Sequence, residues 1–514
     1  MSQEGETNDV SGDDRSGADP PDALTYIGKL IDSSEDQGES QGLEEALRLL
    51  ERFREKEPGL QDVALSFYFE SNAWEALRRI RRDGESRWGW EQDEYERSIL
   101  ALRRARGLGL LTDLNPIRQA QIATNLANAL SHVGRIVEAL ELWQAAMEIV
   151  PRFPMALGNH GRGLVYLAER THDPGHQFLL ARQGYFDLRG AVEAEPHPIA
   201  KDGFAELADR ISQRLSEDRL KQEIELNQHS LGSDSAEVEY REWVLAERLF
   251  LNPLNQLGTY SIAAVDPMML PGITQPISEG PYYLGFFNQM KQEFASARYA
   301  FYRGISDTRP HFSDRGVKLV DTLDYPVYSK NLEAVKDSFR VAYGLFDKIA
   351  FFVNHYFDLG IPDTKVTFRT IWYRKRQRKR GLRDDLEPRR NIALQALFWL
   401  GKDLFEDSEG FREALEPDAQ QISEIRNHLE HKYLKVHGPE WSPEAPPVVS
   451  MADTLAYSLR RDDFEQKALR LLKMARAGLV YLTQAAFLEE RRRTQGDGPV
   501  FPMELDDYDD DLKA

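Results

Sequence analysis

Hydrophobic residues recur at three- and four-residue spacing along most of the chain, which is the period of amphipathic helices. The first clear example is "GLEEALRLLERFREKEPG", which places Ala46, Leu49, Leu50 and Phe53 on one stripe. The Pro-Gly pair at 58–59 then ends the predicted helix, because proline removes a backbone donor and glycine favours a helix end. The pattern therefore predicts a helical protein from its first ordered segment.

A pair of helices follows in "QAQIATNLANALSHVGRIVEALELWQAAMEIVPRF", which resembles a tetratricopeptide repeat. Gly134 takes the turn between the two helices, and Pro151 closes the unit. Small residues let the two helices approach closely while the aromatic residue fills the groove between them. The residues at the packing positions are Leu126, Ala127, Ala139, Trp143 and Ala146.

The same pattern restarts 34 residues later, where Gly161 and Leu164 take the small and large positions of a further first helix. Residues 23–225 therefore resemble a tetratricopeptide array with degenerate copies, a helical solenoid. Such arrays present a concave binding face, so we expect a peptide or protein partner there. An unrelated helical bundle is the alternative.

Residues 226–329 have a different pattern, with prolines that break the helical period and one clear helix in "GFFNQMKQEFASARYAFYRGI". The following "FSDRGVKLVDTLDYPVYS" predicts a short strand or an extended segment. We expect this connecting segment to hold one or two helices and to pack on the C-terminal domain.

Four long amphipathic helices are predicted in the last third of the chain, at about 330–359, 389–407, 417–437 and 450–494. Helices of this length with apolar stripes favour a four-helix bundle over 330–495. The predicted fold is therefore all-α, a helical solenoid followed by a helical bundle.

Composition narrows the class of protein. The 514 residues are 41% hydrophobic and include no cysteine, which excludes disulfides, thiolate zinc sites and a cysteine nucleophile. Residues 1–22 are acidic and rich in Gly, Ser and Asp, so we expect disorder rather than a signal peptide. Residues 496–514 form an acidic tail. No run of about 18 apolar residues occurs, so we expect no membrane span and a cytoplasmic protein.

Charge is distributed unevenly along the chain. The net charge of −20 argues against a protein that coats nucleic acid generally. Yet "RKRQRKR" places six cations within residues 374–380, between the first two predicted bundle helices. This cluster is either a solvated loop or an element that binds RNA phosphates. Its candidate RNA-binding residues are Arg374, Lys375, Arg376, Arg378, Lys379 and Arg380.

The stretch "EIRNHLEHKYLKVHG" carries the candidate chemistry. On a helix, Asn427 and His431 share a face, and the long side chain of Arg426 can bend toward them. An imidazole that titrates near neutrality, a permanent cation and an amide suffice to cleave RNA without a metal. Zinc needs three or four converging ligands, and His428, Glu430 and His431 do not supply that many on one helix face.

"RNHLEH" is similar to the Arg–x4–His signature of ribonucleases in the HEPN superfamily, with a polar residue directly after the arginine. The neighbouring "YGLFDKIAFFVNHYFDLG", "NIALQALFWLGKDLF" and "YREWVLAERLFLNPLNQLG" resemble segments of one bacterial HEPN branch, often preceded by tetratricopeptide repeats. The resemblance implies catalysis by Arg426 and His431 with Asn427 in support. It also implies RNA as substrate, a homodimer whose two motifs face one phosphate, and no metal or cofactor.

Three neighbouring residues are possible supporting groups. His428 could equally be a capping or interface histidine, and Glu430 a surface charge or a dimer contact. Tyr433 is expected in the core rather than as a stacking platform. The motif could also be a solvated helix face, with Arg426 and Glu430 as an ordinary ion pair four residues apart.

Two functional interpretations therefore remain. The first is an endoribonuclease effector, a toxin or antiphage-defence protein whose repeat domain senses a partner. The second is a non-catalytic repeat–HEPN scaffold or an RNA-binding interaction protein. A nucleotidyl-transfer role has less support, because the chain contains no phosphate-binding glycine loop.

Overall fold

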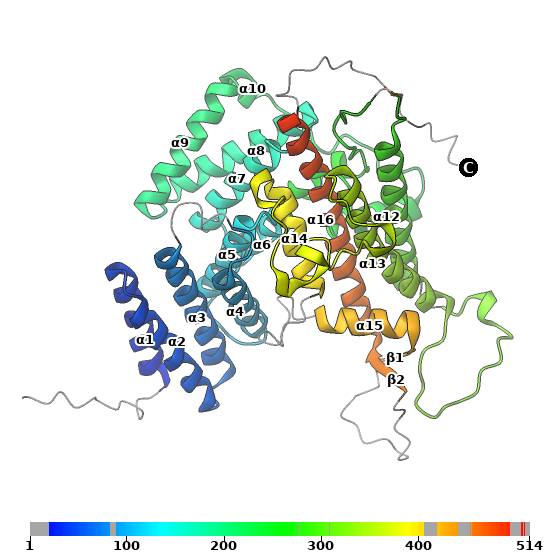
Figure 1. Ribbon diagram of the computed structural model, residues 1–514, viewed down its shortest axis with the longest axis horizontal. Helices are drawn as coiled ribbons and strands as arrows, with labels where there is room; N and C mark the ends of the chain where they lie inside the picture. The colour runs from blue at the N-terminus through cyan, green and yellow to red at the C-terminus, as the bar shows by residue number, and fades with distance from the viewer. Residues whose placement is uncertain are drawn as a thin grey trace, which may run out of the picture.

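The structure of the protein is a computed structural model (Figure 1). It describes residues 20–82, 89–276, 278–307, 309–405, 419–439, 453, 455–493, 505, 506 and 508. Nearly all of the regular structure in these residues is helical, so the prediction of an all-α fold is confirmed. Residues 1–19 of the predicted N-terminal segment, and most of the predicted acidic tail, lie outside the described residues.

The first part of the chain is a succession of helices, each packed against the next. Five of them begin at a proline, where the missing N–H costs no hydrogen bond. The predicted stripe in the second helix is confirmed, because Ala46, Leu50 and Phe53 are buried there. The helices are α1 (Pro20–Gln37), α2 (Ser40–Glu55), α3 (Leu60–Arg81), α4 (Asp93–Leu110), α5 (Pro116–His132), α6 (Ile136–Ile149), α7 (Pro154–Ala168), α8 (Pro174–Glu193), α9 (Pro198–Arg214) and α10 (Glu217–Lys221).

The expected repeat unit forms a helical pair, α5 and α6. Gly134 makes the turn with a φ of +87°, a conformation that side chains disfavour. All five predicted packing positions of this pair are buried. The identity of the pair as a tetratricopeptide repeat stays a prediction.

The connecting segment contains α11 (Ser235–Ala246) and α12 (Tyr282–Ser306). Between them the chain runs through irregular structure with short 3-10 turns, at the prolines that interrupt the pattern. Helix α12 packs along α13 (Lys330–Tyr356), which begins the predicted bundle. The expectation that the segment packs on the C-terminal helices is therefore met for α12.

The bundle consists of α12, α13, α14 (Ile392–Phe405) and α16 (Arg461–Arg493), with the shorter α15 (Ala419–His431) at one end (Figure 1). The third predicted helix was expected to reach residue 437 and the fourth to begin at 450, and both boundaries are wrong. Two parallel strands, β1 (Tyr433–His437) and β2 (Ala456–Arg460), occupy these positions.

The two strands form because each supplies hydrogen-bonding partners for the backbone of the other. The short apolar run "YLKVH" fits a helix or a strand equally well by period alone. Pairing of Leu434 with Tyr457 and of Val436 with Leu459 satisfies the backbone and buries the aliphatic side chains. Pro326 also bridges His437 in antiparallel fashion, which confirms the extended segment predicted before α13.

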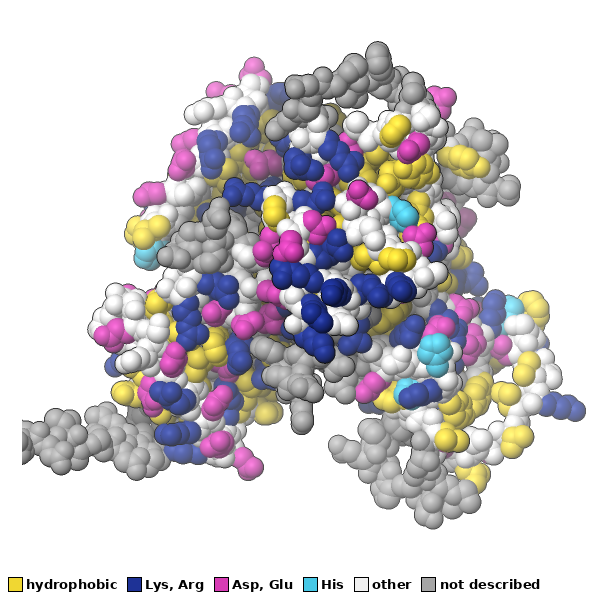
Figure 2. All heavy atoms as spheres, in the orientation of Figure 1, with side chains coloured by type: hydrophobic (Ala, Val, Ile, Leu, Met, Phe, Trp, Pro, Cys, Tyr) yellow, Lys and Arg dark blue, Asp and Glu magenta, His cyan; other side chains and the backbone are white. Residues whose placement is uncertain are grey.

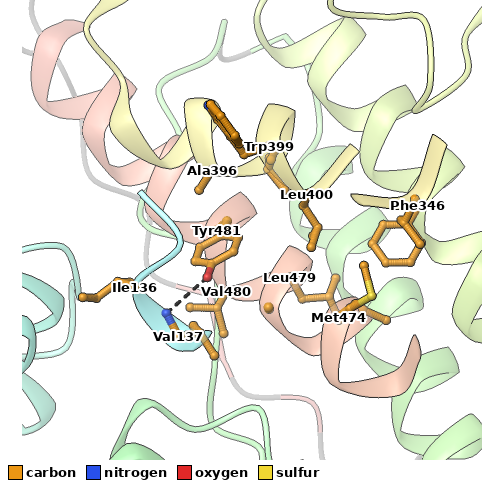
Figure 3. Packing of buried hydrophobic residues seen from close by; sticks show 14 of the residues in the cluster. Ile136, Val137, Phe346, Ala396, Trp399, Leu400, Met474, Leu479, Val480 and Tyr481 are labelled. Atoms are coloured by element: carbon orange, nitrogen blue, oxygen red, sulfur yellow. Dashed lines mark hydrogen bonds between the residues drawn. The ribbon is translucent and has the colours of Figure 1, made fainter. Parts of the chain in front are cut away.

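The repeat helices and the bundle share one hydrophobic core. Figure 3 shows Ile136 and Val137 of α6 close to Ala396 of α14 and Tyr481 of α16. The Tyr481 hydroxyl accepts a hydrogen bond from the Val137 backbone N–H at 3.1 Å. This shared core fixes α3 to α8 onto the bundle, whereas α1 and α2 pack in a separate hydrophobic cluster.

A buried polar cluster accompanies this core. Asp403 of α14 accepts two hydrogen bonds from Arg103, at 2.8 and 2.9 Å, and a further one from Arg135. Burial alone would raise the pKa of the Asp403 carboxyl, but Arg103 and Arg135 outweigh it and hold that pKa well below its usual value. Asn391 caps α14 by accepting from the Leu394 N–H at 3.1 Å. Asn391 and Asp403 therefore stabilise the packing of α14.

Candidate active site

Helix α15 presents one face to the bundle and the other to solvent. Ile422 and Ile425 are fully buried, which anchors the helix. Arg426 is half-buried, while Asn427 and His431 are exposed. The motif thus lies on the outer side of a helix whose inner side is fixed by packing, and His431 is its last residue.

Arg426 is held in a defined place. Its guanidinium lies over the ring of Tyr343 on α13, 5.5 Å from the ring centroid, and donates to the Asn427 side-chain oxygen at 3.2 Å. Burial raises the pKa of Tyr343 to about 12, although Arg426 acts in the opposite direction. A cation–aromatic contact therefore joins α15 to α13 at the site.

A cavity of about 230 Å³ opens beside this contact. Its lining combines two guanidinium groups with two carboxylates and an apolar floor. His431 is absent from that lining, so one copy of the chain does not enclose Arg426 and His431 in a common cavity. The lining residues are Phe339, Arg340, Tyr343, Gly344, Asp347, Arg426, Leu429 and Glu430.

Two of the possible supporting residues have structural contacts. The His428 imidazole hydrogen-bonds the Glu424 carbonyl at 2.8 Å and stacks on Tyr457 of β2, with ring centroids 5.3 Å apart. Glu430 pairs with Arg340 of α13 at 3.5 Å, not with Arg426. Glu430 and His428 therefore fix α15 against α13 and β2.

Tyr433 was expected in the core, and this is wrong, since 38% of its surface is exposed. Tyr433 is the first residue of β1 and its one exposed position, since Leu434 to His437 are all buried. The Tyr433 hydroxyl lies 3.4 Å from that of Tyr328, which is also exposed. Two accessible tyrosines, Tyr328 and Tyr433, therefore lie side by side where the chain leaves α15.

The basic cluster is exposed, as a loop of two 3-10 turns at Arg374–Arg376 and Arg378–Arg380. Figure 2 shows Lys and Arg side chains gathered in the middle of the visible face, where Figure 1 places the segment before α14. Some of these charges are already compensated, because Arg374 pairs with Asp384 and Arg378 lies 4.0 Å from Glu96.

Sequence reasoning missed two cations that lie near Tyr343, the residue against which Arg426 packs. Arg369 is exposed and close enough to lower the pKa of Tyr343, the residue on which Arg426 rests. Arg340 lines the same cavity. No local pattern marks these residues, because the packing of α13 against α15 and the path of the loop bring them together.

No group of three or more His, Asp and Glu side chains suited to a metal ion occurs among the residues that the structure describes. None of the described helices has the length and apolar character to cross a membrane.

The fold and the site define a helical bundle with a basic, histidine-bearing motif on its shortest helix. Residues 274–489 match the family model described as LA2681-like HEPN, which supports a HEPN domain over α12 to α16. The matched range contains Arg426, Asn427 and His431, and a HEPN domain indicates a ribonuclease-related or nucleotide-related function. Comparisons with curated proteins and with solved structures gave no match.

Proposed function

We propose that the protein is a metal-independent endoribonuclease of HEPN type, with Arg426, Asn427 and His431 as its catalytic residues. The observation that carries the proposal is their position on one helix, α15, within the matched HEPN range, with Asn427 and His431 exposed and Arg426 half-buried. An accessible imidazole and a fixed guanidinium on one rigid helix meet the minimum requirement for acid–base cleavage of RNA.

The chemistry is an internal transfer of the phosphoryl group. The imidazole of one His431 accepts the proton of the 2′-hydroxyl as the 2′-oxygen attacks phosphorus. The bond from phosphorus to the 5′-oxygen breaks, and that oxygen takes up a proton. The products are a 2′,3′-cyclic phosphate and a 5′-hydroxyl, while Arg426 stabilises the negative charge that develops on the phosphoryl oxygens.

A second copy of the chain completes the site. One imidazole cannot accept a proton and deliver another in the same step, so two copies of His431 serve as base and acid. The exposure of His431 and its position outside the Arg426 cavity agree with a site that is incomplete in one chain. The proposed assembly is therefore a homodimer through the bundle, with the two α15 helices facing one phosphate.

RNA reaches the site along the cations of the same domain. Arg369 extends the positive charge from Tyr343 toward the loop at 374–380, whose exposed Lys and Arg side chains suit phosphate contacts. Because a net charge of −20 repels RNA from the rest of the chain, a local basic track is needed to bind it.

The repeat helices control the nuclease in this proposal. They bind a peptide or protein partner, and they share a core with α14 and α16 through which a partner can act on the bundle. An enzyme that damages the RNA of its own cell needs such restraint. A toxin or antiphage-defence effector is the role that this arrangement suits.

The test is incubation of the purified protein with total RNA and tRNA in EDTA. We expect cleavage by the unmodified chain and none by His431→Ala, whereas Lys29→Ala should cleave normally because this exposed cation lies on α1, outside the bundle. RNA that is bound but left intact by the unmodified chain would favour the non-catalytic scaffold instead.

A further inference from the structure

The connection between α12 and α13 is an arm that stands away from the molecule. We define the arm as residues 309–328, and Figure 1 shows it in green beside α15, β1 and β2. Seven of the 24 large hydrophobic side chains that are exposed in the described part of the chain lie on it, with 46 to 85% of their surface open. These seven are Phe312, Val317, Leu319, Val320, Leu323, Tyr325 and Tyr328.

Both ends of the arm are firmly attached. At its first end, the Asp314 carboxylate accepts from the Lys330 backbone N–H at 3.0 Å, at the start of α13. At its second end, the Val327 N–H donates to the Val436 carbonyl at 2.8 Å, beside β1. The exposed apolar residues thus belong to a segment that is attached to the rest of the structure at both ends.

A buried ion pair sets the direction of the arm. Lys435 of β1 is 4% exposed at its side chain and contacts Asp324 at 2.5 Å and Asp453 at 2.7 Å. On either side of Asp324, Leu323 and Tyr325 adopt φ values of +66° and +51°, which residues with a Cβ rarely take. Strain of this kind persists only where the surroundings over-determine the conformation.

The middle of the arm has no tertiary partner among the described residues. The backbone groups of residues 318–322 form no hydrogen bond with other described backbone groups. Extended chain with free backbone groups and aliphatic side chains is a surface to which another protein chain can add.

We propose that the arm docks on a second copy of the chain, against the partner's α15–β1 end. The inference rests on the proposed two-copy site and names the surface that assembles it. Because the arm is attached beside the strand that follows His431, a two-fold arrangement that faces the two α15 helices can bring each arm to the other copy. The receiving end also offers apolar surface, since Leu455 is 79% exposed and Tyr433 is accessible.

The available area fits a dimer. A buried Val, Leu or Phe side chain removes roughly 100 Å² from water, so the seven side chains at their observed exposures offer on the order of 400 Å². In a two-fold pair each copy contributes both an arm and a receiving end, which reaches roughly the 800 Å² per partner of a standard interface.

A protein surface suits the arm better than RNA does. The aliphatic Val317, Leu319 and Val320 have no flat ring for a base to stack on. Arg315 and Lys318 are offset by Asp321 and Asp324, so the arm lacks the charge excess of a phosphate-binding segment.

Cross-linking provides the direct test, because the chain contains no cysteine of its own. Val320→Cys, labelled with a maleimide photo-cross-linker, should give a species of twice the chain mass. In mixtures of isotope-labelled and unlabelled protein, peptides from 419–439 or 455–460 of the other copy should carry the link. Ile199→Cys on α9 is the matched control, since its side chain is 80% exposed and far from the arm in sequence. It should give no such species.

Sedimentation of charge variants gives an independent readout. Val320→Asp should raise the dissociation constant of the dimer at least tenfold without changing the melting temperature, because the side chain contacts nothing in one copy. Leu319→Asp should act likewise, and Ile199→Asp should do neither. Unchanged self-association, a monomeric unmodified protein, or weakened RNA binding with an intact dimer would each overturn the inference. A dimer that depends on the arm but never cleaves RNA would refute the proposed function without refuting the role of the arm in dimerisation.

Discussion

At the scale of single residues, Arg426 and His431 differ in how firmly the bundle holds them. Arg426 is fixed between Tyr343 and Asn427, whereas His431 ends its helix in solvent. A fixed guanidinium can stabilise charge without reorganising, and an accessible imidazole can exchange protons with substrate. This division suits a site in which each chain supplies a rigid cation and a proton carrier.

The identity of the cation should therefore matter beyond its charge. Arg426→Lys keeps the positive charge but loses the planar fork that rests on Tyr343 and donates to Asn427. We expect the rate of RNA cleavage to fall on the order of 10²-fold, with little change in melting temperature. Single-turnover cleavage assays measure this, with Lys29→Ala on α1 as control. Full activity in Arg426→Lys would show that Arg426 does not contact the reacting phosphate.

At the scale of elements, the end of α15 depends on the strands that follow it. The helix stops at His431 because residues 433–437 pair with Ala456–Arg460 and with the segment around Pro326. Lys435 joins these pieces through Asp324 and Asp453. Burial alone would lower the pKa of Lys435, but its hydrogen bonds to the two carboxylates raise it well above the usual value.

Removing this cation should loosen the strands and the arm together. Lys435→Met keeps the length of the side chain but leaves Asp324 without its partner. We expect a loss of about 1–3 kcal/mol in the free energy of unfolding. Hydrogen exchange should be faster at the Val327 amide, whose N–H donates to the Val436 carbonyl. Unaltered exchange at Val327 would contradict the role assigned to Lys435.

At the scale of the whole molecule, helices α3 to α8 and the bundle are held together by a shared core and by buried polar contacts. Arg103 and Arg135 of the first part both bind Asp403 of α14, and Tyr481 of α16 donates to Glu138 of α6. Gly134 lies so close to α14 that an added Cβ would meet the Ile392 carbonyl oxygen at 2.3 Å. Contacts of this kind couple whatever binds the repeats to the helices that hold the site.

The Asp403 cluster predicts a defined dependence of stability on pH. Since the pKa of Asp403 is depressed in the folded chain, its stabilising contribution is complete above about pH 4, the value for an unfolded Asp. That contribution is lost as the pH falls toward the lower folded value. Asp403→Asn should cost about 3 kcal/mol or more at pH 7, because two buried guanidinium groups lose their carboxylate. Denaturant unfolding should show this difference shrink between pH 4 and pH 2. A difference independent of pH would argue against the ionised pair.

The shared core also predicts cooperative unfolding. Calorimetry of the full chain should give a single transition, because separating the parts would expose the core around Tyr481 and the Asp403 charges. Gly134→Ala should lower the melting temperature or split that transition, through the clash with Ile392 and the positive φ. Two resolved transitions in the unmodified chain would show that the parts are independent.

The periodic pattern was enough to predict most of the helices, and it failed where distant segments decide the outcome. Ala46, Leu50 and Phe53 are buried as predicted because a helix stripe is a local property. Residues 433–437 were assigned to a helix because nothing within that run identifies its partner strand, about 20 residues further along. The contacts of Arg426 with Tyr343, and the exposure of Tyr433, follow from tertiary packing and left no trace in the local sequence.

The chemical ends of the cleaved RNA test the central claim most directly. With tRNA and EDTA, the unmodified protein should yield fragments with a 5′-hydroxyl and a 2′,3′-cyclic phosphate or 3′-phosphate, and His431→Ala should yield none. Fragments that carry a 5′-phosphate, or undiminished cleavage by His431→Ala, would contradict the account.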